Sequence, residues 1–338
     1  MTRAKIVTLA GAGIFGLSCA WEILRRGGAV RVVEAERIGA GSSGGTVGAL
    51  APHAPENWNE KKQVQLEALV GAESWWHEIE DAGGRASGYG RTGRLQPVAA
   101  ASLPRIAERI AGAGKHWPAW ARMEILRESG AALVPESPDG LWLYDNLTAR
   151  LHPRLALAAL AAAVTAKGGE IVTGTALDGA ASEQPVVWAT GAAGLAAFGG
   201  NGVKGQSALL AFAAPDAPQV FADALHIVPH VDGSVGIGST SEREVASLET
   251  DAQLDALCDK AVAICPALAS APVVDRWAGI RPRAKSRAPL IGPWPGREGH
   301  FVANGGFKIG FGMAPAVARM VADLVLEGRD TIPEGFHS

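Results

Sequence analysis

Cysteine is scarce in this chain, and the few residues present exclude a disulfide framework. The 338 residues include only Cys19, Cys258 and Cys265. Their number is odd, no two of them form a Cys-x-x-Cys pair, and no secretion signal precedes them. We therefore expect reduced thiols in a cytoplasmic protein.

Long apolar runs and an excess of one charge are also missing. Residues 6–10 are apolar, but a glycine turn interrupts them at Gly11, so they predict neither a signal peptide nor a membrane span. Lys and Arg number 31 against 34 Asp and Glu, a net charge of −3, which gives no field for binding nucleic acid. No fixed-period repeat and no long disordered tract occurs. The apolar fraction of 48% predicts a soluble globular protein of one large or two intertwined domains.

The N-terminus carries the clearest pattern. A short apolar run, "KIVTLA" (5–10), is followed at once by "GAGIFG" (11–16), an amphipathic helical stretch, and a second apolar run, "AVRVVEA" (29–35). This order of strand, Gly-x-Gly-x-x-Gly, helix, strand and acid is typical of a dinucleotide-binding fold. The alternative is a glycine turn that binds no ligand.

Each element of that pattern has a physical role in the dinucleotide interpretation. Gly11 permits the tight turn, Gly13 lets backbone N–H groups approach a pyrophosphate, and Gly16 lets the helix lie close to the strand. The helix N-terminus stabilises the phosphate charge. Glu34 would accept hydrogen bonds from ribose hydroxyls and would repel a 2′-phosphate.

The next stretch favours FAD over NAD. "RIGAGSSGGTVGALAPH" (37–53) is rich in small and hydroxylated residues, which a nicotinamide-binding domain does not need there. An extended FAD would run past it, so we assign Ser42, Ser43 and Thr46 to phosphate or ribitol contacts. A polar surface loop is the alternative interpretation.

Later segments predict that the nucleotide-binding domain is discontinuous. Residues 153–169 predict a helix and 170–177 a strand, and 185–194 predict an apolar strand broken at Gly191, with Thr190–Gly191 close to the ribose and pyrophosphate. Residues 203–282 are strand-like, with "VDGS" as a hairpin turn, and include a helix that is capped near Thr250.

The fold class is therefore α/β (α+β), with two interleaved domains. We expect a Rossmann-like FAD-binding domain from residues 1–54, 150–202 and 283–338. We expect residues 55–149 and 203–282 to form a substrate domain on a mostly antiparallel sheet. The tryptophans of residues 55–149 are interpreted as core and interface fillers.

In sequence, the chain resembles the D-amino-acid oxidase/glycine oxidase superfamily of FAD-dependent amine oxidoreductases, and glycine oxidase most in pattern. The resemblance spans nearly the whole chain and rests on "GAGIFG", "GSSGGTVGALAPH", "VVWATG", "HIVPHVDGSVGIGSTSE", "AGIRPRAKSRAPLIG" and "NGGFKIGFGMAPA". It implies an FAD domain with a sheet that covers the flavin. It also implies that "NGGFKIGFG" crosses the pyrimidine edge of the flavin, where its N–H groups, the next helix and Lys308 would favour reduction.

Together, motif and resemblance predict a non-covalent FAD site and no metal site. The predicted cofactor contacts are Gly11, Gly13, Ile14, Phe15, Gly16, Glu34, Ala35, Ser42, Ser43, Thr46, Gly48, Ala49, Leu50, Leu177, Thr190, Gly191, Gly305, Gly306, Phe307, Lys308, Ile309 and Gly310.

The resemblance also assigns a substrate site. The arginine of the Gly-x-Arg-Pro motif pairs with the substrate carboxylate in this family, and that role falls to Arg281 here, with Arg283 as the neighbour that could be confused with it. His226 stands where glycine oxidase has tyrosine, Lys308 where it has arginine, and Ala49 where it has methionine. We therefore include His226 and Lys308 in the substrate site, and His53 as a weaker candidate. A structural salt bridge of Arg281 and a sheet histidine at position 226 are the alternatives.

The implied activity is oxidative deamination of a small amine or amino acid, such as glycine, sarcosine or a D-amino acid, with hydrogen peroxide release. No side-chain base is required. Three alternatives stay open: a dehydrogenase of the same fold that reduces a quinone or carrier instead of dioxygen, a flavin-bound protein without turnover, and a nicotinamide dehydrogenase. The sequence leaves the substrate, the electron acceptor and the oligomeric state open.

Overall fold

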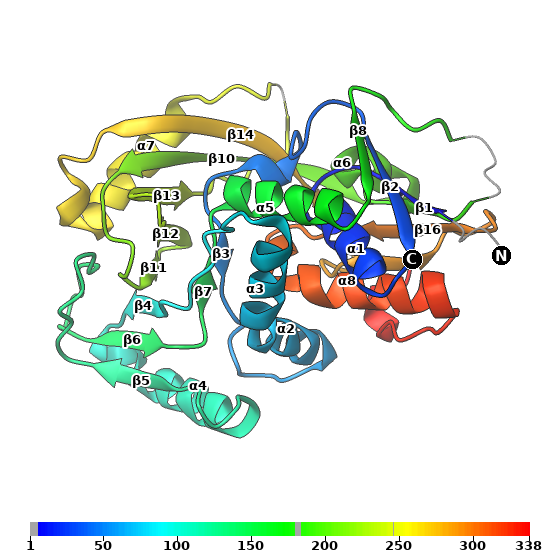
Figure 1. Cartoon of the computed structure of the whole chain (residues 1–338). Coiled ribbons are helices and arrows are strands. Elements are labelled where there is room, and N and C mark those ends of the chain that lie inside the picture. The colour runs from blue at the N-terminus through cyan, green and yellow to red at the C-terminus, as the bar shows by residue number, and fades with distance from the viewer. Residues whose placement is uncertain (1–5, 180–183, 246) are drawn as a thin grey trace.

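The strands form two large sheets, one mostly parallel and one mostly antiparallel (Figure 1). The computed structural model describes residues 6–179, 184–245 and 247–338, so Lys5, the first residue of the predicted N-terminal strand, lies outside the described residues. The α/β fold class predicted from the sequence is confirmed.

The six-stranded sheet contains the N-terminal unit. Its strands, in spatial order, are β15 (Leu290–Pro293), β16 (His300–Asn304), β9 (Val186–Trp188), β1 (Ile6–Ala10), β2 (Ala29–Glu34) and β8 (Glu170–Thr173). All neighbours are parallel except β15 and β16. Strands far apart in sequence are thus neighbours, because β1 pairs with both β2 and β9.

Close backbone approaches hold helix α1 (Ile14–Arg25) against this sheet. A Cβ atom on Gly16 would lie 1.9 Å from the carbonyl oxygen of Gly11. Gly11 itself has φ +104°, and a Cβ there would lie 2.5 Å from the carbonyl oxygen of Ala189. Only glycine fits these two positions, which explains the spacing of the motif.

The eight-stranded sheet lies against the other side of the cavity described below. Its order is β14 (Val273–Arg283), β10 (Asn201–Ala211), β13 (Ser234–Gly238), β12 (Leu225–Pro229), β11 (Gln219–Ala222), β4 (Arg94–Pro97), β6 (Trp142–Asp145) and β5 (Met123–Leu126). In this sheet β4 and β11 are parallel neighbours, and the other neighbouring strands are antiparallel. The predicted "VDGS" hairpin joins β12 to β13, with Gly233 at φ +84°. A third sheet pairs β3 (Ala49–Leu50) with β7 (Ala149–Arg150).

The helices cover the sheets and fill the space beside them. Besides α1 they are α2 (Glu60–Val70), α3 (Ala72–Gly83), α4 (Leu103–His116), α5 (Pro153–Ala166), α6 (Gly191–Leu195), α7 (Ala252–Ile264) and α8 (Gly310–Glu327). The residue that caps helix α7 is Asp251, one residue after the expected Thr250, and it accepts a hydrogen bond from Gln253 N at 2.9 Å. In the described part of the chain, no helix combines the length and apolarity that crossing a membrane requires.

The main core surrounds α1, whose residues are buried from Ile14 to Leu24. Trp75 and Trp76 pack into this core, as the sequence predicted for the tryptophans. Trp120 does not: it is 47% exposed, and the guanidinium of Arg91 lies over its ring, 4.8 Å from the centroid. The interpretation of every tryptophan as a core or interface filler was therefore wrong at Trp120, whose exposed ring lies against the largely buried side chain of Arg91.

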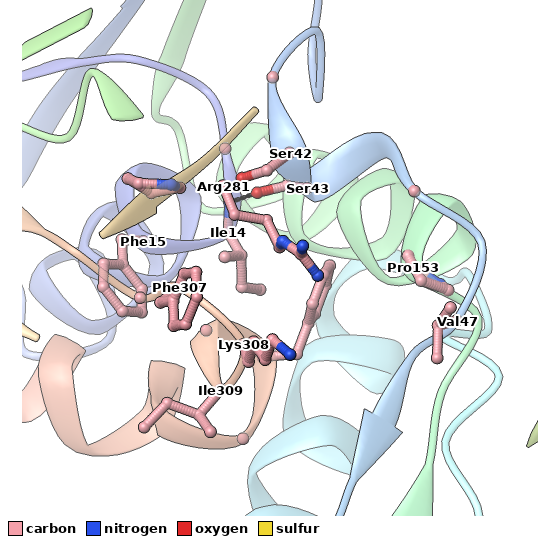
Figure 2. Close-up of a pocket in the computed structure, with 18 of the residues that line it drawn as sticks. Ile14, Phe15, Ser42, Ser43, Val47, Pro153, Arg281, Phe307, Lys308 and Ile309 are labelled. Carbon is pink, nitrogen blue, oxygen red and sulfur yellow. Dashed lines mark hydrogen bonds between the residues drawn. The ribbon is translucent and has the colours of Figure 1, made fainter. Parts of the chain in front are cut away.

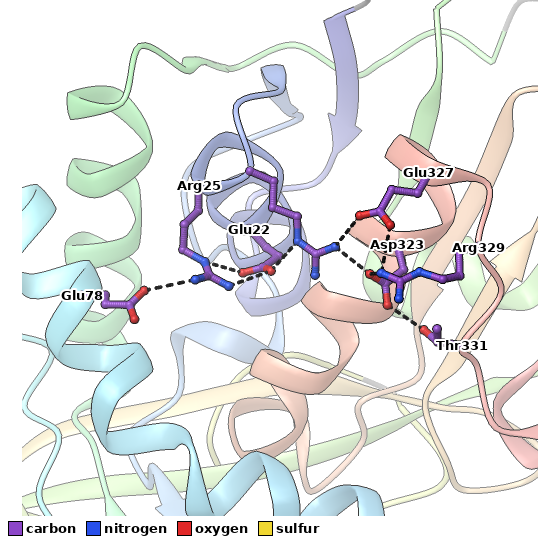
Figure 3. Close-up of polar contacts among 8 residues, drawn as sticks. Glu22, Arg25, Glu78, Asp323, Glu327, Arg329 and Thr331 are labelled. Atoms are coloured by element: carbon purple, nitrogen blue, oxygen red, sulfur yellow. Dashed lines mark hydrogen bonds and ion pairs between the residues drawn. The ribbon is translucent and has the colours of Figure 1, made fainter.

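Charged side chains join α1 to α8 at the ends farthest from the cavity (Figure 3). Glu22 of α1 is fully buried and accepts from Arg25 Nε at 2.9 Å and Arg26 Nε at 2.8 Å. Arg26 Nη1 continues to Asp323 of α8 at 2.6 Å. Asp323 also accepts from Arg329 at 2.8 Å and Thr331 at 2.9 Å, so it links the two helices to the C-terminal segment.

Asp323→Asn should lower stability, and the loss should depend on pH. Burial opposes ionisation of Asp323, but the hydrogen bonds from Arg26 and Thr331 outweigh it and hold its pKa below the ordinary value. This stabilisation is present above the unfolded pKa of about 3.9 and disappears as pH falls through the lower folded pKa. We expect a loss of about 1.5–3 kcal/mol at neutral pH, the range for hydrogen bonds to charged groups.

The measurement is denaturant unfolding at saturating cofactor, repeated at neutral pH and below pH ~4. Glu327→Gln on the same helix is the matched control, because Glu327 is 47% exposed and should contribute below about 1 kcal/mol. Equal losses for both variants at neutral pH would contradict the role of Asp323.

Candidate functional site

A cavity of about 820 Å³ lies between the six-stranded and the eight-stranded sheet. One wall consists of the turn after β1, the end of β2 and the loop that leads to β3. The opposite wall is the face of the eight-stranded sheet that carries Ser207, His226, Gly238, Trp277 and Arg281. The turn between β16 and α8 lies at its floor (Figure 2).

The first glycine turn presents the N-terminus of α1 to this cavity. The helix begins after Gly13 without a side-chain cap from that residue. Instead, Ser43 of the following loop accepts a hydrogen bond from Ile14 N at 3.0 Å, so the loop lies directly beside the helix end. A Cβ on Gly13 would lie 3.2 Å from this Ser43 hydroxyl. The arrangement leaves the positive helix end close to a hydroxylated loop, as an anion site requires.

Glu34 lies at the end of β2 on the cavity wall. Its carboxylate accepts from Ala12 N at 2.7 Å and from Glu36 N at 3.1 Å. A carboxylate has further lone pairs, so these bonds hold its orientation and leave acceptor capacity for a ligand hydroxyl. Among the described residues that line the cavity, Glu34 is the only carboxylate.

The structure brings nearly all predicted cofactor residues to this one cavity. Those on its walls are Gly11, Gly13, Ile14, Phe15, Glu34, Ala35, Ser42, Ser43, Thr46, Gly48, Ala49, Leu50, Leu177, Thr190, Gly191, Gly306, Phe307, Lys308, Ile309 and Gly310. Gly16 and Gly305 are not on its walls. They permit the close helix contact and the left-handed turn that shape the cavity's surroundings. The hydroxyl of Thr46 is directed to the sheet, where it donates to Ser207 Oγ at 2.8 Å.

The second glycine turn joins β16 to α8. Asn304 Oδ1 accepts from Gly305 N at 2.8 Å, and Asn304 Nδ2 donates to the carbonyl of Gly191 at 2.9 Å, so this turn is tied to the loop after β9. Gly305 has φ +74° and Phe307 has φ +42°, a region that a phenylalanine rarely adopts. Helix α8 then begins after Ile309 without a side-chain cap, so a second helix N-terminus faces the cavity.

Arg281 reaches the cavity from β14 and is held only by uncharged acceptors. Its Nη1 donates to Ser239 Oγ at 2.6 Å, and its Nη2 donates to the carbonyl oxygen of Thr240 at 2.7 Å. Burial lowers the pKa of Arg281, partly offset by the nearby charge of Glu242. Within the described part of the chain no carboxylate forms an ion pair with it. Arg283, two residues on, does not line the cavity.

Lys308 points into the same part of the cavity as Arg281 (Figure 2). Burial and then the charge of Arg281 lower its pKa, and its ammonium has no ion-pair partner among the described residues. His226 lies between cations: burial, Arg94 and Lys308 lower its pKa to about 3. His226 is therefore a neutral imidazole near pH 7, which can form hydrogen bonds but is too weakly basic to accept a proton from an ammonium group.

His53 also lines the cavity, where Gln65 Oε1 contacts both its backbone N–H and its Nδ1. Burial and then Lys61 lower its pKa. Sequence reasoning missed Gln65, Arg94 and Trp277 on the cavity wall. Period-two alternation backward from Arg281 would have found Trp277, whereas nothing in the sequence pattern marks Gln65 or Arg94.

The cavity fits a long dinucleotide with a negatively charged middle. Two helix N-termini face it, and glycines on its walls allow close backbone approach. The one carboxylate among the described lining residues, Glu34, lies at the ribose position of the motif. A Cβ atom on Gly13 would crowd the Ser43 hydroxyl, and a Cβ atom on Gly306 would crowd the Phe15 ring, so a larger residue at either position would narrow the cavity. Beyond the dinucleotide, Arg281 and Lys308 leave two cations for an anionic ligand.

Comparison with known proteins agrees with this geometry. A family model described as "FAD dependent oxidoreductase" (DAO) matches residues 7–324. A glycine oxidase of Pseudomonas putida is 28% identical over 95% of this chain and 94% of its own length. A bifunctional ThiO/ThiG protein of Trichormus variabilis is 26% identical over 100% of this chain, which spans 55% of that protein. The crystal structure of a glycine oxidase from Geobacillus kaustophilus superposes with TM-score 0.84 at 21% identity, covering 98% of this chain and 97% of that one.

Glu34→Arg should weaken FAD binding, because it removes the acceptor for the ribose hydroxyls and adds bulk to the cavity wall. Loss of hydrogen bonds to a charged group predicts about a 10- to 100-fold increase in the FAD dissociation constant. The constant is measured by titrating FAD into the apoprotein. Glu36→Arg is the matched control, because Glu36 is exposed and does not line the cavity. Equal FAD affinity of the two variants would contradict the assignment.

Proposed function

The chain belongs to the DAO family of FAD-dependent oxidoreductases, and from this premise we propose that it oxidatively deaminates a small amino acid whose carboxylate binds Arg281. The observation that carries the proposal is the Arg281 guanidinium, which faces the cofactor cavity without a carboxylate partner among the described residues. The relatives named glycine oxidase support glycine as a substrate, and the family resemblance extends the proposal to sarcosine and small D-amino acids.

We propose that FAD is held without a covalent bond. Helix α1 and the Ser42–Ser43 loop would bind its pyrophosphate, Glu34 its ribose, and the turn from Gly305 to Gly310 its ring system. The dipoles of two helix N-termini support this assignment, because both favour negative charge in the cavity. Bound FAD supplies the two-electron oxidant for the reaction.

Arg281 suits a carboxylate because its orientation is fixed before the ligand arrives. Ser239 and Thr240 hold the guanidinium through neutral oxygens, so its full charge stays available to a ligand. A planar guanidinium can donate two parallel hydrogen bonds to a carboxylate. Such a contact fixes the substrate relative to the cofactor, an effect that is large when it selects a near-attack geometry.

The same cations favour the reactive form of the amine. An amino acid reacts as the free amine, and two neighbouring positive charges, Arg281 and Lys308, lower the pKa of a substrate ammonium. No lining carboxylate at this end of the cavity, within the described residues, opposes that effect. His226 would act as a neutral hydrogen-bonding group.

The overall reaction then follows. The substrate loses two electrons and two protons as its C–N bond becomes C=N, and water hydrolyses the product to an oxo acid and ammonia. We propose dioxygen as the acceptor, which takes up both electrons and both protons to give hydrogen peroxide. A quinone or protein carrier is the competing acceptor.

We also propose the division of the chain made above. The six-stranded sheet supports residues 1–54, 150–202 and 283–338 as the FAD-binding domain. Most strands of the eight-stranded sheet come from 55–149 and 203–282, which supports these as the substrate domain. Three cysteines without a disulfide support a cytoplasmic location.

The test of this function is an anaerobic screen of glycine, sarcosine and small D-amino acids against the purified holoprotein. At least one should bleach the flavin absorbance, and admission of air should restore the colour with one hydrogen peroxide per turnover. Bleaching that air does not reverse would instead favour a dehydrogenase. A flavin that no amine bleaches would contradict the proposal and favour a protein without turnover.

Arg281→Lys should weaken carboxylate binding, because an ammonium offers a point charge in place of a planar fork. Loss of a charge-assisted pair in a partly desolvated site predicts about 2–5 kcal/mol, or roughly 30- to several-thousand-fold in affinity. The measurement is the dissociation constant of benzoate, followed by the flavin spectrum, together with the KM for the amino acid found in the screen.

Arg283→Lys is the matched control on the same strand, because Arg283 does not line the cavity. FAD content and the oxidation of any amine without a carboxylate should change little in either variant. A folded, yellow Arg281→Lys protein with unchanged benzoate affinity would assign the carboxylate to another group. Loss of the fold or of FAD would make Arg281 a structural residue.

A further inference from the structure

A buried lysine lies behind Arg281, on the neighbouring strand. Lys204 of β10 is 3% exposed, and its ammonium lies 3.3 Å from Glu242 Oε2 and 3.4 Å from Asp251 Oδ2. Backbone hydrogen bonds of 2.9 Å run both ways between Lys204 and Glu242, so the two residues are held directly opposite each other. Neither side chain lines the cavity.

Glu242 is held by several donors at once. Its Oε1 accepts from Thr240 Oγ1 at 2.8 Å and from Gln206 Nε2 at 3.0 Å, while Oε2 faces Lys204. Burial opposes its ionisation, but the bonds from Gln206, Thr240 and Lys204 outweigh it and hold the pKa of Glu242 below its ordinary value. Glu242 is thus a carboxylate anion at neutral pH.

This anion lies next to the groups that hold Arg281. The guanidinium donates to Ser239 Oγ and to the carbonyl oxygens of Thr240 and Lys204, at 2.6, 2.7 and 3.4 Å. Thr240 is two residues from Glu242, and the charge of Glu242 already acts on Arg281. Yet Glu242 pairs with Lys204, and Arg281 keeps only neutral acceptors.

We infer that Lys204 is a positioning residue that binds Glu242 and so prevents this carboxylate from neutralising Arg281. The inference rests on the proposed role of Arg281 in carboxylate binding. Lys204 has no contact with the ligand in this scheme. It acts by leaving the guanidinium without a protein counter-ion, so that a carboxylate ligand supplies one.

Removal of the ammonium should therefore act through Glu242. In Lys204→Met, Glu242 keeps the bonds from Thr240 and Gln206 but loses its cation, while its charge still acts on Arg281. The side chains of Lys204 and Gln206 lie on the opposite face of β10 from Arg281, so Glu242 acts on the guanidinium through its charge and without direct contact. This partial neutralisation competes with any ligand carboxylate. Asp251 also loses a partner, but its side chain is 45% exposed, so solvent screens its charge.

The experiment is a double-mutant cycle on the FAD-loaded protein, read as the benzoate dissociation constant from the flavin spectrum. We expect Lys204→Met to weaken benzoate by about 10-fold or more, the scale of one desolvated charge pair. Glu242→Gln keeps the shape and removes the charge, so it should weaken benzoate no more than about 3-fold. The double variant should return to within about 3-fold of the parent.

The contrast between the two single variants is the result that a merely structural role cannot give. Either single substitution leaves one buried charge of the pair without its partner, so a structural pair would lose benzoate affinity in Glu242→Gln as well as in Lys204→Met. Lys260→Met is the matched control: Lys260 is a half-buried residue of α7 whose ammonium donates to the carbonyl oxygen of Asp223 at 2.7 Å, away from Glu242 and the cavity. It should leave benzoate affinity unchanged.

Two results would overturn the inference: unchanged benzoate affinity in Lys204→Met, or a double variant that binds benzoate as weakly as Lys204→Met or more weakly. Failure of the proposed function is recognised separately. If Arg281→Lys leaves benzoate affinity unchanged, the carboxylate site itself is misassigned. If Arg281→Lys weakens benzoate while the cycle shows no rescue, only the role of Lys204 is wrong.

Discussion

The close approach of Gly16 to the carbonyl oxygen of Gly11 is the contact on which the site depends. It lets α1 lie against the parallel sheet, and because α8 packs beside α1, it also sets the position of the second helix. Both helices begin at the cavity, and ion pairs through Arg26 and Asp323 join them at the far ends (Figure 3). The close glycine contact at one end and the charged cluster at the other therefore hold the N-termini of both helices beside the same cavity, where both favour a negatively charged ligand.

The charge of the cavity follows from what the fold leaves unpaired. Burial lowers the pKa of Arg281 and of Lys308, which means that the folded protein holds both cations at an energetic disadvantage. Arg94, a buried cation on the cavity wall, is paired with Asp145 at 3.0 Å, so it does not share this disadvantage. The unpaired charges of Arg281 and Lys308 therefore destabilise the free protein, and an anionic ligand would offset this destabilisation. This is a physical reason to assign the functional site to this part of the cavity.

The sequence predicted the parts of the site that are local. The two glycine turns, Glu34 and the hydroxylated loop each lie within a short stretch whose spacing has a backbone explanation. The pairs set by sheet register were not predictable in this way. Arg94 faces Asp145, and Lys204 faces Glu242, across strands or loops dozens of residues apart. No local pattern marks such partners, since register depends on the whole sheet.

The substrate side and the cofactor side of the cavity meet at one backbone contact. Phe307 N donates to the carbonyl oxygen of Pro282 at 3.1 Å, so the residue after Arg281 is bonded to the residue before Lys308. The Phe307 ring also lies beside two arginines of β14, Arg281 and Arg283, with guanidinium carbons 5.6 and 5.9 Å from its centroid. The left-handed backbone of Phe307 is the strained conformation that makes this contact possible. Any movement of β14 is therefore transmitted to the turn that carries Lys308, and the two proposed domains share one site that neither could form alone.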